Sequence, residues 1–237
     1  MSGPSLRAIV HDQSGRTERA MLDNLNDIAD KIRLSFEAKN AVRDTALVQS
    51  RELIRHCANS IRAIHRHEFD EARELLDHAT KSARTMVDGM AAHEDLHQAG
   101  YSQDALKELA EAHITYALVR DLPLPDPDEL GIDYAAYLNG PGEAVGELRR
   151  YALDLVRRDE VEKSEQILQA MDDIYSVLVT VDFPDAITRG LRRTTDVTRS
   201  ILEKTRGDLT MTLRQERLQK ALADFERRIG TGEGSAG

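Results

Sequence analysis

Four glutamates in the chain occupy spacings at which an α-helix would group their carboxylates. Glu108 and Glu111 are three residues apart, and Glu143 and Glu147 are four residues apart. Side chains at these spacings share one helix face, where like charges destabilise an isolated helix by roughly 0.2–0.5 kcal/mol per pair. Carboxylate oxygens are the ligands that Mg²⁺ and Mn²⁺ prefer, and such ions activate water in phosphodiester hydrolysis. The spacing therefore predicts a site for Mg²⁺ or Mn²⁺; the alternative is that these are ordinary solvated acids.

Basic residues nearby in the sequence account for only two of the four carboxylates. Lys107 is four residues from Glu111, and Arg150 is three residues from Glu147, so each lies within reach on its helix face. The other two glutamates have no basic residue three or four positions away. Negative charge without a nearby basic side chain favours a bound cation.

A second motif points to different chemistry. His93-Glu94-Asp95-Leu96-His97 fits the His-Glu-x-x-His pattern, in which two imidazoles on one helix face hold Zn²⁺ and the glutamate is a general base. A zinc hydrolase using His93, Glu94 and His97 is therefore an alternative function. Asp95 places a charge inside the motif, Gln103 stands where a third histidine might follow, and the motif falls at a predicted helix end. A solvated helix terminus is the favoured interpretation.

The elements that position these residues are all predicted to be helical. No proline occurs between Pro4 and Pro123, and apolar residues recur at three- and four-residue spacing from residue 42 onward, as in amphipathic helices. The prolines within residues 122–131 mark the clearest turn, and no strand pattern or internal repeat is present. We expect an all-α protein with helices over residues 42–67, 70–90, 102–120 with Ser102 as N-cap, 133–158 with a pause at 139–142, 161–181, 185–206 and 208–229.

Composition limits the class of protein. The chain has 237 residues, 41% of them hydrophobic and 31% charged, which is ordinary for a globular domain. We expect one domain over residues 16–229, a flexible segment at 1–15 and a disordered tail at 230–237. The single cysteine, Cys57, lies on an apolar helix stripe and forms no internal disulfide, and no apolar run is long enough to span a membrane. These features predict a cytoplasmic protein without a membrane partner.

The formal net charge of −10 bears on nucleic-acid binding. Proteins that bind nucleic acids usually carry a basic surface, because neutralisation of phosphates supplies much of the affinity. This chain would therefore have to gather its basic residues on one surface. Aromatic residues make up only 4% of the chain, so backbone contacts with little sequence specificity are favoured over base stacking.

Four segments, in order over about residues 43–210, resemble the translin/TRAX family. Leu106-Lys107-Glu108-Leu109-Ala110-Glu111-Ala112 is similar to its Leu-x-Glu-x-x-Glu-Ala segment. Tyr137-Leu138-Asn139-Gly140-Pro141-Gly142-Glu143-Ala144-Val145-Gly146-Glu147-Leu148-Arg149-Arg150 is similar to its Tyr-Leu-x-Gly…Asp-x-x-Gly-Glu-Leu-x-Arg segment. Ser50-Arg51-Glu52 with Ile61 and His65-Arg66 is similar to its long first helix, and Arg206-Gly207 to its C-terminal Arg-Gly.

The resemblance implies an all-α fold of about seven helices that assembles into a hollow, roughly octameric homo-oligomer and binds single-stranded RNA or DNA. It also implies the Mg²⁺-dependent endoribonuclease activity of the TRAX-like branch, whose catalytic acids fall on Glu108, Glu111 and Glu143. Glu147 is then a fourth ligand or an orienting group, and Glu143 stands where TRAX carries Asp. Three basic residues of the first helix are candidates to hold neighbouring phosphates: Arg51, His65 and Arg66.

Alternatives stay open beside this nuclease. His65 and Arg66 have a simpler role available, because basic residues at a helix C-terminus complement its dipole. A non-catalytic protein of the same fold that binds single-stranded RNA or DNA is the second functional hypothesis. The zinc hydrolase is the third.

Overall fold

The computed structural model describes residues 10–232, which form helices and connecting loops with no strand in that range. The all-α prediction is confirmed, although in place of about seven helices the described part has six long helices and three single turns. None of these helices is long and apolar enough to cross a bilayer. The long helices are α1 (Val10–His65), α2 (Phe69–Gly89), α4 (Gly100–Val119), α6 (Tyr134–Val156), α7 (Val161–Thr180) and α9 (Leu191–Gly232), and the single turns are α3 (Glu94–His97), α5 (Pro127–Leu130) and α8 (Asp185–Thr188).

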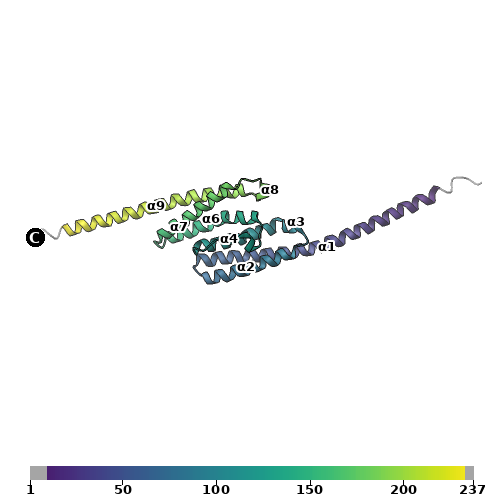
Figure 1. The fold of residues 1–237 in the computed structure, drawn as a ribbon, viewed down its shortest axis with the longest axis horizontal. Coiled ribbons are helices and arrows are strands. Elements are labelled where there is room, and N and C mark those ends of the chain that lie inside the picture. Colours follow the sequence, from purple (N-terminus) through teal and green to yellow (C-terminus); the bar gives the residue numbers. More distant parts are fainter. Residues whose placement is uncertain (1–9, 233–237) are drawn as a thin grey trace, which may run out of the picture.

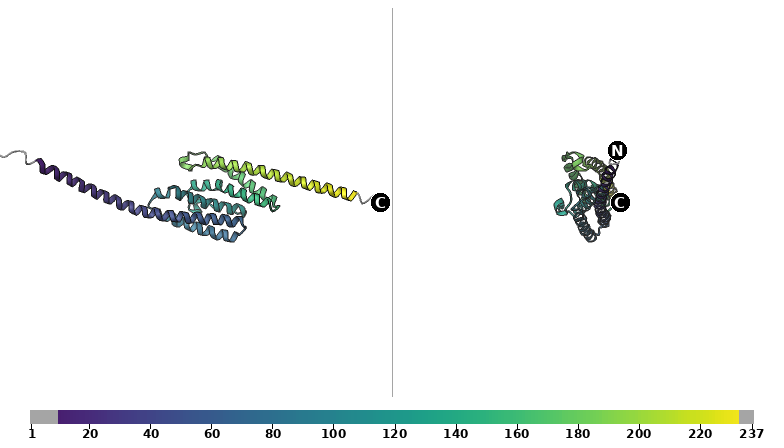
Figure 2. Two further views of the ribbon diagram at one scale, coloured as in Figure 1. Left: turned by 180° about the vertical axis from the view of Figure 1, so that it is seen from behind. Right: turned by 90° about the vertical axis from the view of Figure 1, so that its right-hand side faces the viewer.

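The six long helices pack side by side, with α4 and α6 in the middle of the array (Figure 1). One side is formed by α1 and α2, which pack on each other and on α4, and the other by α7 and α9, which pack on α6. The first part of α1 and the last part of α9 leave the bundle in opposite directions, as Figure 1 and the left view of Figure 2 show. We refer to the projecting parts whose side chains the structure describes as the α1 arm (residues 24–36) and the α9 arm (residues 210–228).

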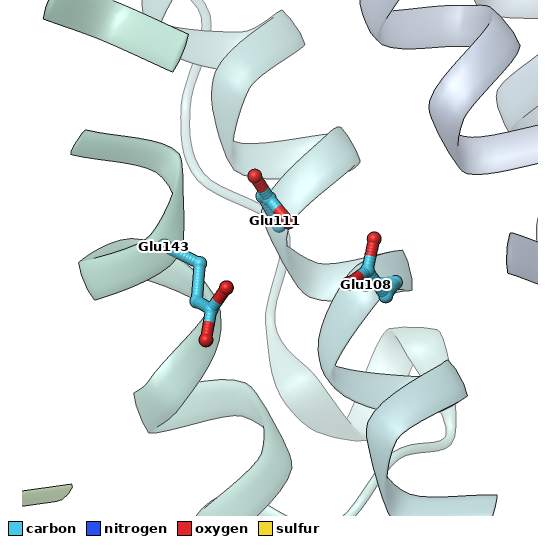
Figure 3. Close-up of side chains that lie close together, drawn as sticks. All are labelled: Glu108, Glu111 and Glu143. Atoms are coloured by element: carbon cyan, nitrogen blue, oxygen red, sulfur yellow. The ribbon is translucent and has the colours of Figure 1, made fainter. Parts of the chain in front are cut away.

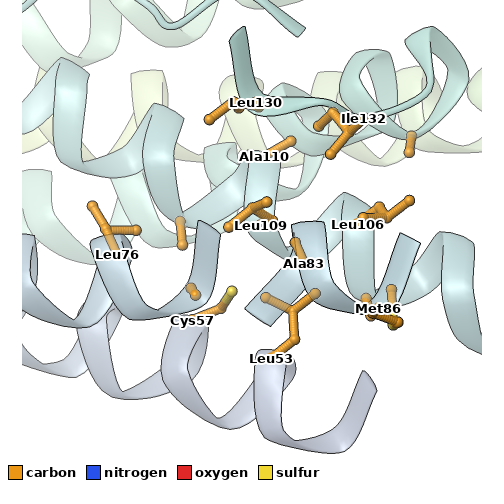
Figure 4. Close-up of a cluster of buried hydrophobic side chains, with 14 of the residues drawn as sticks. Leu53, Cys57, Leu76, Ala83, Met86, Leu106, Leu109, Ala110, Leu130 and Ile132 are labelled. Atoms are coloured by element: carbon orange, nitrogen blue, oxygen red, sulfur yellow. The ribbon is translucent and has the colours of Figure 1, made fainter. Parts of the chain in front are cut away.

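The hydrophobic core consists of two main clusters, one on each side of the helix array. Between α1, α2 and α4, apolar side chains such as Leu53, Met86 and Leu109 are fully buried (Figure 4). A second cluster between α6, α7 and α9 includes Leu148 and Met171. Cys57 is buried in the first cluster, as its place on an apolar stripe predicts, and burial raises the pKa of its thiol.

Two helices are longer than the sequence analysis predicts. The first begins at Val10 instead of residue 42, so residues 10–15 are helical where a flexible segment was expected. The last runs through Gly207, where two separate helices were expected, and includes residues 230–232 of the expected tail. A single glycine costs a helix only about 1 kcal/mol relative to alanine, which is too little to end one of this length. Residues 1–9 and 233–237 lie outside the described part of the chain.

The start of α4 also differs from its prediction. Its N-cap is Ala99, and Gly100 is its first residue, so Gly100 does not separate the helix from the preceding turn. Ser102 lies inside the helix and is fully buried. Its hydroxyl donates to the backbone oxygen of Leu96 at 2.8 Å, which ties α4 to α3.

The expected pause at residues 139–142 is wrong, because α6 continues straight through Pro141. Proline removes one backbone hydrogen bond and normally kinks or ends a helix. Here the surrounding packing holds the segment in place. The side-chain amide of Asn139 donates to the backbone oxygens of Ala135 at 2.8 Å and Thr188 at 2.9 Å, and its oxygen accepts from the hydroxyl of Thr194 at 2.7 Å.

The glycines on either side of Pro141 let α6 approach two helices at once. A Cβ at Gly140 would lie 2.5 Å from the Cβ of Ala110 on α4. A Cβ at Gly142 would lie still closer to Cγ2 of Thr194 on α9. No carbon atoms pack at such distances, so both contacts require glycine.

These contacts predict that Gly140→Ala and Gly142→Ala each lower the free energy of unfolding by about 1–3 kcal/mol, because the added methyl forces packed helices apart. Gly146 is the matched control, since it lies on the same helix and a Cβ there meets no atom within 4 Å. Gly146→Ala should raise stability by up to about 1 kcal/mol through helix propensity. Urea denaturation of the three variants measures the difference, and equal stabilities would contradict the packing argument.

Candidate metal centre

Three of the four predicted acids come together between the two central helices. Glu108 and Glu111 project from α4, and Glu143 projects from α6 (Figure 3). One carboxylate oxygen of each residue lies within 4.8 Å of the others. The close contact of Gly140 with α4 lies directly beside this group, so the glycine packing and the gathering of carboxylates are parts of one arrangement. We call Glu108, Glu111 and Glu143 the acid cluster.

Glu147 lies next to the acid cluster but is engaged by another residue. Its Oε2 is 2.5 Å from Nε2 of His65, a side chain that is only 3% exposed. The hydrogen bond from His65 lowers the pKa of Glu147, although burial opposes the shift. Glu147 still acts on the cluster at longer range, because its charge raises the pKa of both Glu108 and Glu111.

The three predicted phosphate-binding residues do not lie together at one place on α1. His65 is buried and faces Glu147, so its position suits orienting that carboxylate. The exposed guanidinium of Arg66 pairs with Glu68 and, at 3.2 Å, with Glu71. Arg51 is exposed and lies 14 residues before His65, about 21 Å away along the axis of α1.

The basic neighbours of the cluster also differ from those expected. Lys107 donates to Glu143 at 2.9 Å, across to α6, and not to Glu111 on its own helix. This follows from the close packing of α6, which brings an exposed carboxylate to Lys107 while Glu111 stays buried. Burial opposes the charge on Lys107, but the hydrogen bond and charge of Glu143 outweigh it and raise the pKa of the amine.

The acid cluster carries more negative charge than its surroundings balance. Burial, followed by the charges of Glu108, Glu143 and Glu147, raises the pKa of Glu111 to about 8. Burial also raises the pKa of Glu108, and the nearby acids add to the effect against the opposing charge of Lys107. Carboxylates held this close and this dry favour either a proton or a metal ion between them.

The donor set fits a hard divalent cation. Mg²⁺ binds oxygen at about 2.1 Å, so two oxygens on the same ion lie at most ~4.2 Å apart. The carboxylate oxygens of the acid cluster lie within 4.8 Å of one another, so at most a small movement of the flexible Glu side chains brings them to this spacing.

The zinc alternative is not supported by the geometry. His93 is the N-cap residue of α3, a helix of only four residues, so the motif does not place two imidazoles on one helix face. His97 is engaged through Nε2 with Asp133 at 2.8 Å, and Asp95 pairs with Lys39 at 2.5 Å. Among the histidines whose side chains the structure describes, none belongs to a group that suits a metal ion.

Two pairs beside the cluster were not predicted from the sequence: Lys107 with Glu143, and His65 with Glu147. The partners are separated by 36 and 82 residues, and no local spacing rule relates them. One indication of the first pair was present in the sequence: Glu143 has no basic residue on its own helix face, so a basic partner had to come from another helix.

The raised pKa of Glu111 predicts that the metal-free protein loses stability as the pH rises. A carboxyl with a pKa of about 8 in the folded chain, against an ordinary value of 4.5, binds its proton more tightly when folded. Its stabilising contribution is therefore fully present below pH ~4.5 and is lost as the pH approaches about 8. In EDTA, the free energy of unfolding of the wild type should fall across this window by up to a few kcal/mol relative to Glu111→Gln, whose amide does not titrate. Denaturant titrations over this pH range test this, and parallel pH profiles would contradict it.

Similarity to known proteins identifies the family. No protein-family model matches the chain. An uncharacterized protein of Methanocaldococcus jannaschii is 31% identical over 186 residues, which are 78% of this chain and 82% of the relative. An archaeal structure, AfC3PO, is 30% identical with a TM-score of 0.73, and the match covers 80% of this chain and 98% of AfC3PO.

Two further structures are similar. AfC3PO in complex with duplex RNA is 31% identical with a TM-score of 0.69, over the same shares of the two chains. The fungal apo-NeC3PO has a TM-score of 0.67 over 89% of this chain and all of its own, but at 20% identity it supports the fold alone. The identity and coverage shared with AfC3PO, together with the fold, show that the chain belongs to the translin/TRAX family.

Proposed function

We propose that this protein is a Mg²⁺- or Mn²⁺-dependent endoribonuclease that acts on single-stranded RNA in the cytoplasm. The observation that carries the proposal is the acid cluster, in which two helices bring three carboxylates within 4.8 Å of one another. A divalent cation bound there would supply Lewis-acid activation of water and stabilisation of charge on the phosphate. In the reaction, water adds to phosphorus and the bond from phosphorus to the leaving ribose oxygen breaks.

We assign different roles to the residues around that cation. Glu108, Glu111 and Glu143 would hold it. The hydrogen bond from His65 keeps Glu147 ionised. We assign Glu147 the role of orienting the three carboxylates of the acid cluster, one helix turn after Glu143 on α6. Lys107 donates to Glu143, so its ammonium group would offset part of the negative charge that the carboxylates and a substrate phosphate bring together.

A relative supports RNA as the substrate class. AfC3PO was solved in complex with duplex RNA, and it is 31% identical to this chain. Single strands remain our proposed substrate for cleavage, because an unpaired strand can bend its backbone toward the partly buried carboxylates of the acid cluster. A comparison of single-stranded and duplex RNA therefore belongs in the test.

A second function is favoured by one observation. Lys107 already neutralises Glu143, so the acid cluster has an internal cation that reduces its need for a metal ion. A protein stabilised in this way would bind single-stranded RNA or DNA without cutting it. Cleavage assays separate the two functions.

We predict that Glu108→Gln and Glu111→Gln each reduce cleavage of labelled single-stranded RNA by at least about 100-fold in Mg²⁺, because each removes a charged ligand from the cation. EDTA should abolish cleavage by the wild type. Glu165→Gln, an exposed acid on α7, is the matched control and should cut at the wild-type rate. Undiminished cutting by the cluster variants would refute the site, and binding without any cleavage by the wild type would favour the second function.

We also propose that the chain forms a homo-oligomer through its two arms, with an octamer as the expected size. Both arms expose apolar residues at helical spacing, and such stripes seldom remain uncovered on a soluble monomer. On the α1 arm these residues are Leu25, Ile28, Ile32 and Phe36, and on the α9 arm they are Met211, Leu218, Leu222 and Phe225, all between 46% and 67% exposed.

The arms predict that Ile28→Asp with Ile32→Asp, or Leu218→Asp with Leu222→Asp, reduces the mass of the assembly measured by light scattering. A buried charge at either stripe would cost several kcal/mol, which is enough to dissociate the interface. Val179→Asp is the control, since it places the same charge on an equally exposed apolar residue of α7. An unchanged mass in both double variants would rule out the arms as the interface.

A further inference from the structure

A cavity of about 630 Å³ opens beside Glu143, between α4, α6 and the start of α9. Sites for small ligands typically have volumes of roughly 300–1,000 Å³, so it has room for one nucleotide. Glu143 and Lys107 are part of its wall, which means that the cavity borders the acid cluster. An RNA strand bound at the acid cluster could therefore extend into the cavity.

The charges around this cavity are mainly basic, in a protein that is acidic overall. Three cationic side chains line it against two acids, Asp104 and Glu143. Two of the cations have partners within the protein: Lys107 donates to Glu143, and the guanidinium of Arg189 donates to the backbone oxygen of Gln98 at 3.3 Å.

Arg193 is the third cation and the one available to a ligand. It is exposed and forms neither a hydrogen bond nor an ion pair with the described residues. It lies in the first turn of α9, where the helix dipole adds further positive potential. A guanidinium in this setting suits bidentate binding of a phosphate.

The remaining wall suits a nucleoside. Val197, which is 49% exposed, and Ile201 give an apolar surface one and two turns beyond Arg193. No aromatic side chain is among the described residues that line the cavity. A base would thus be held by apolar contact without stacking or a reading of its edge, which gives little preference for sequence.

We propose that this cavity is the subsite for the nucleotide next to the scissile phosphate, with Arg193 binding the phosphate of that nucleotide. The inference rests on the proposed function, because it takes RNA cleavage at the acid cluster as given. It adds the direction in which the strand leaves the cluster, and it assigns binding to residues of α9 outside the motifs that resemble the family.

The test measures binding of a labelled oligouridylate in EDTA, where no cleavage occurs. Arg193→Ala should weaken binding about tenfold at low salt and lower the slope of log K against log salt by about 0.7, the value for one phosphate contact on a single strand. Arg192→Ala is the matched control: it removes the same charge from the neighbouring residue, which pairs with Asp182 at 3.6 Å and does not line the cavity. It should leave both quantities unchanged.

A steric variant tests the cavity itself. Val197→Trp fills the space without altering charge and should also weaken binding, whereas Val177→Trp, at an exposed position on α7 away from the cavity, should not. Equal losses in Arg192→Ala and Arg193→Ala would overturn the proposal in favour of general electrostatic attraction. Unchanged binding in Arg193→Ala and Val197→Trp would overturn it directly. If Arg193→Ala weakens binding of uridine monophosphate but not of the oligomer, the cavity is a site for free nucleotides and the proposal is also wrong.

Cleavage by Glu108→Gln in Mg²⁺ distinguishes this failure from failure of the proposed function. If Glu108→Gln is inactive while Arg193→Ala binds like the wild type, the subsite is wrong and the nuclease assignment stands. If Glu108→Gln cuts normally while Arg193→Ala loses affinity, the acid cluster is wrong and the binding site stands.

Discussion

The close approach of α6 to α4 and α9 governs the geometry of the acid cluster. Gly140 lies against Ala110 of α4 and Gly142 against Thr194 of α9, at distances that leave no room for a Cβ. Because these contacts flank Glu143 on one side, they fix how far that carboxylate stands from Glu108 and Glu111. Any side chain added at the contacts would widen the spacing between helices and separate the carboxylates. The packing and the chemistry of the site are therefore set by the same few atoms.

The carboxylates held together in this way repel one another, and hydrogen bonds from basic side chains offset only part of the repulsion. Glu147 receives a hydrogen bond from His65, and Glu143 receives one from Lys107, but Glu111 remains buried among acids. Its raised pKa expresses the cost of ionising it there. The net charge of −10 is thus a poor guide to the local distribution of charge, because the acid cluster borders a cavity lined by three cations.

Much of this organisation follows from the sequence. Periodicity placed α2 and α7 to within one residue at each end, and the glutamate spacing indicated two carboxylate pairs. Pro141 and Gly207 were misleading, because local propensity suggests breaks where tertiary packing and helix length prevail. The partner of Glu147 lies 82 residues away, and such contacts depend on the packed fold, which no local pattern encodes. Spacing alone indicates pairs of acids on single helices, and only the resemblance to a family joined Glu108, Glu111 and Glu143 into one predicted site.

The two arms have a consequence for symmetry. They leave opposite ends of the bundle and differ in sequence, so each copy has two distinct apolar stripes to cover (Figure 2). If each stripe pairs with its own kind, both contacts are isologous, and a closed ring built from two alternating isologous contacts contains an even number of chains. If the α1 stripe pairs with the α9 stripe, the contact is head-to-tail, and the ring closes at whatever number the rotation between copies dictates. The parity of the assembly thus distinguishes the two modes of pairing: an odd number of chains in a ring excludes the first.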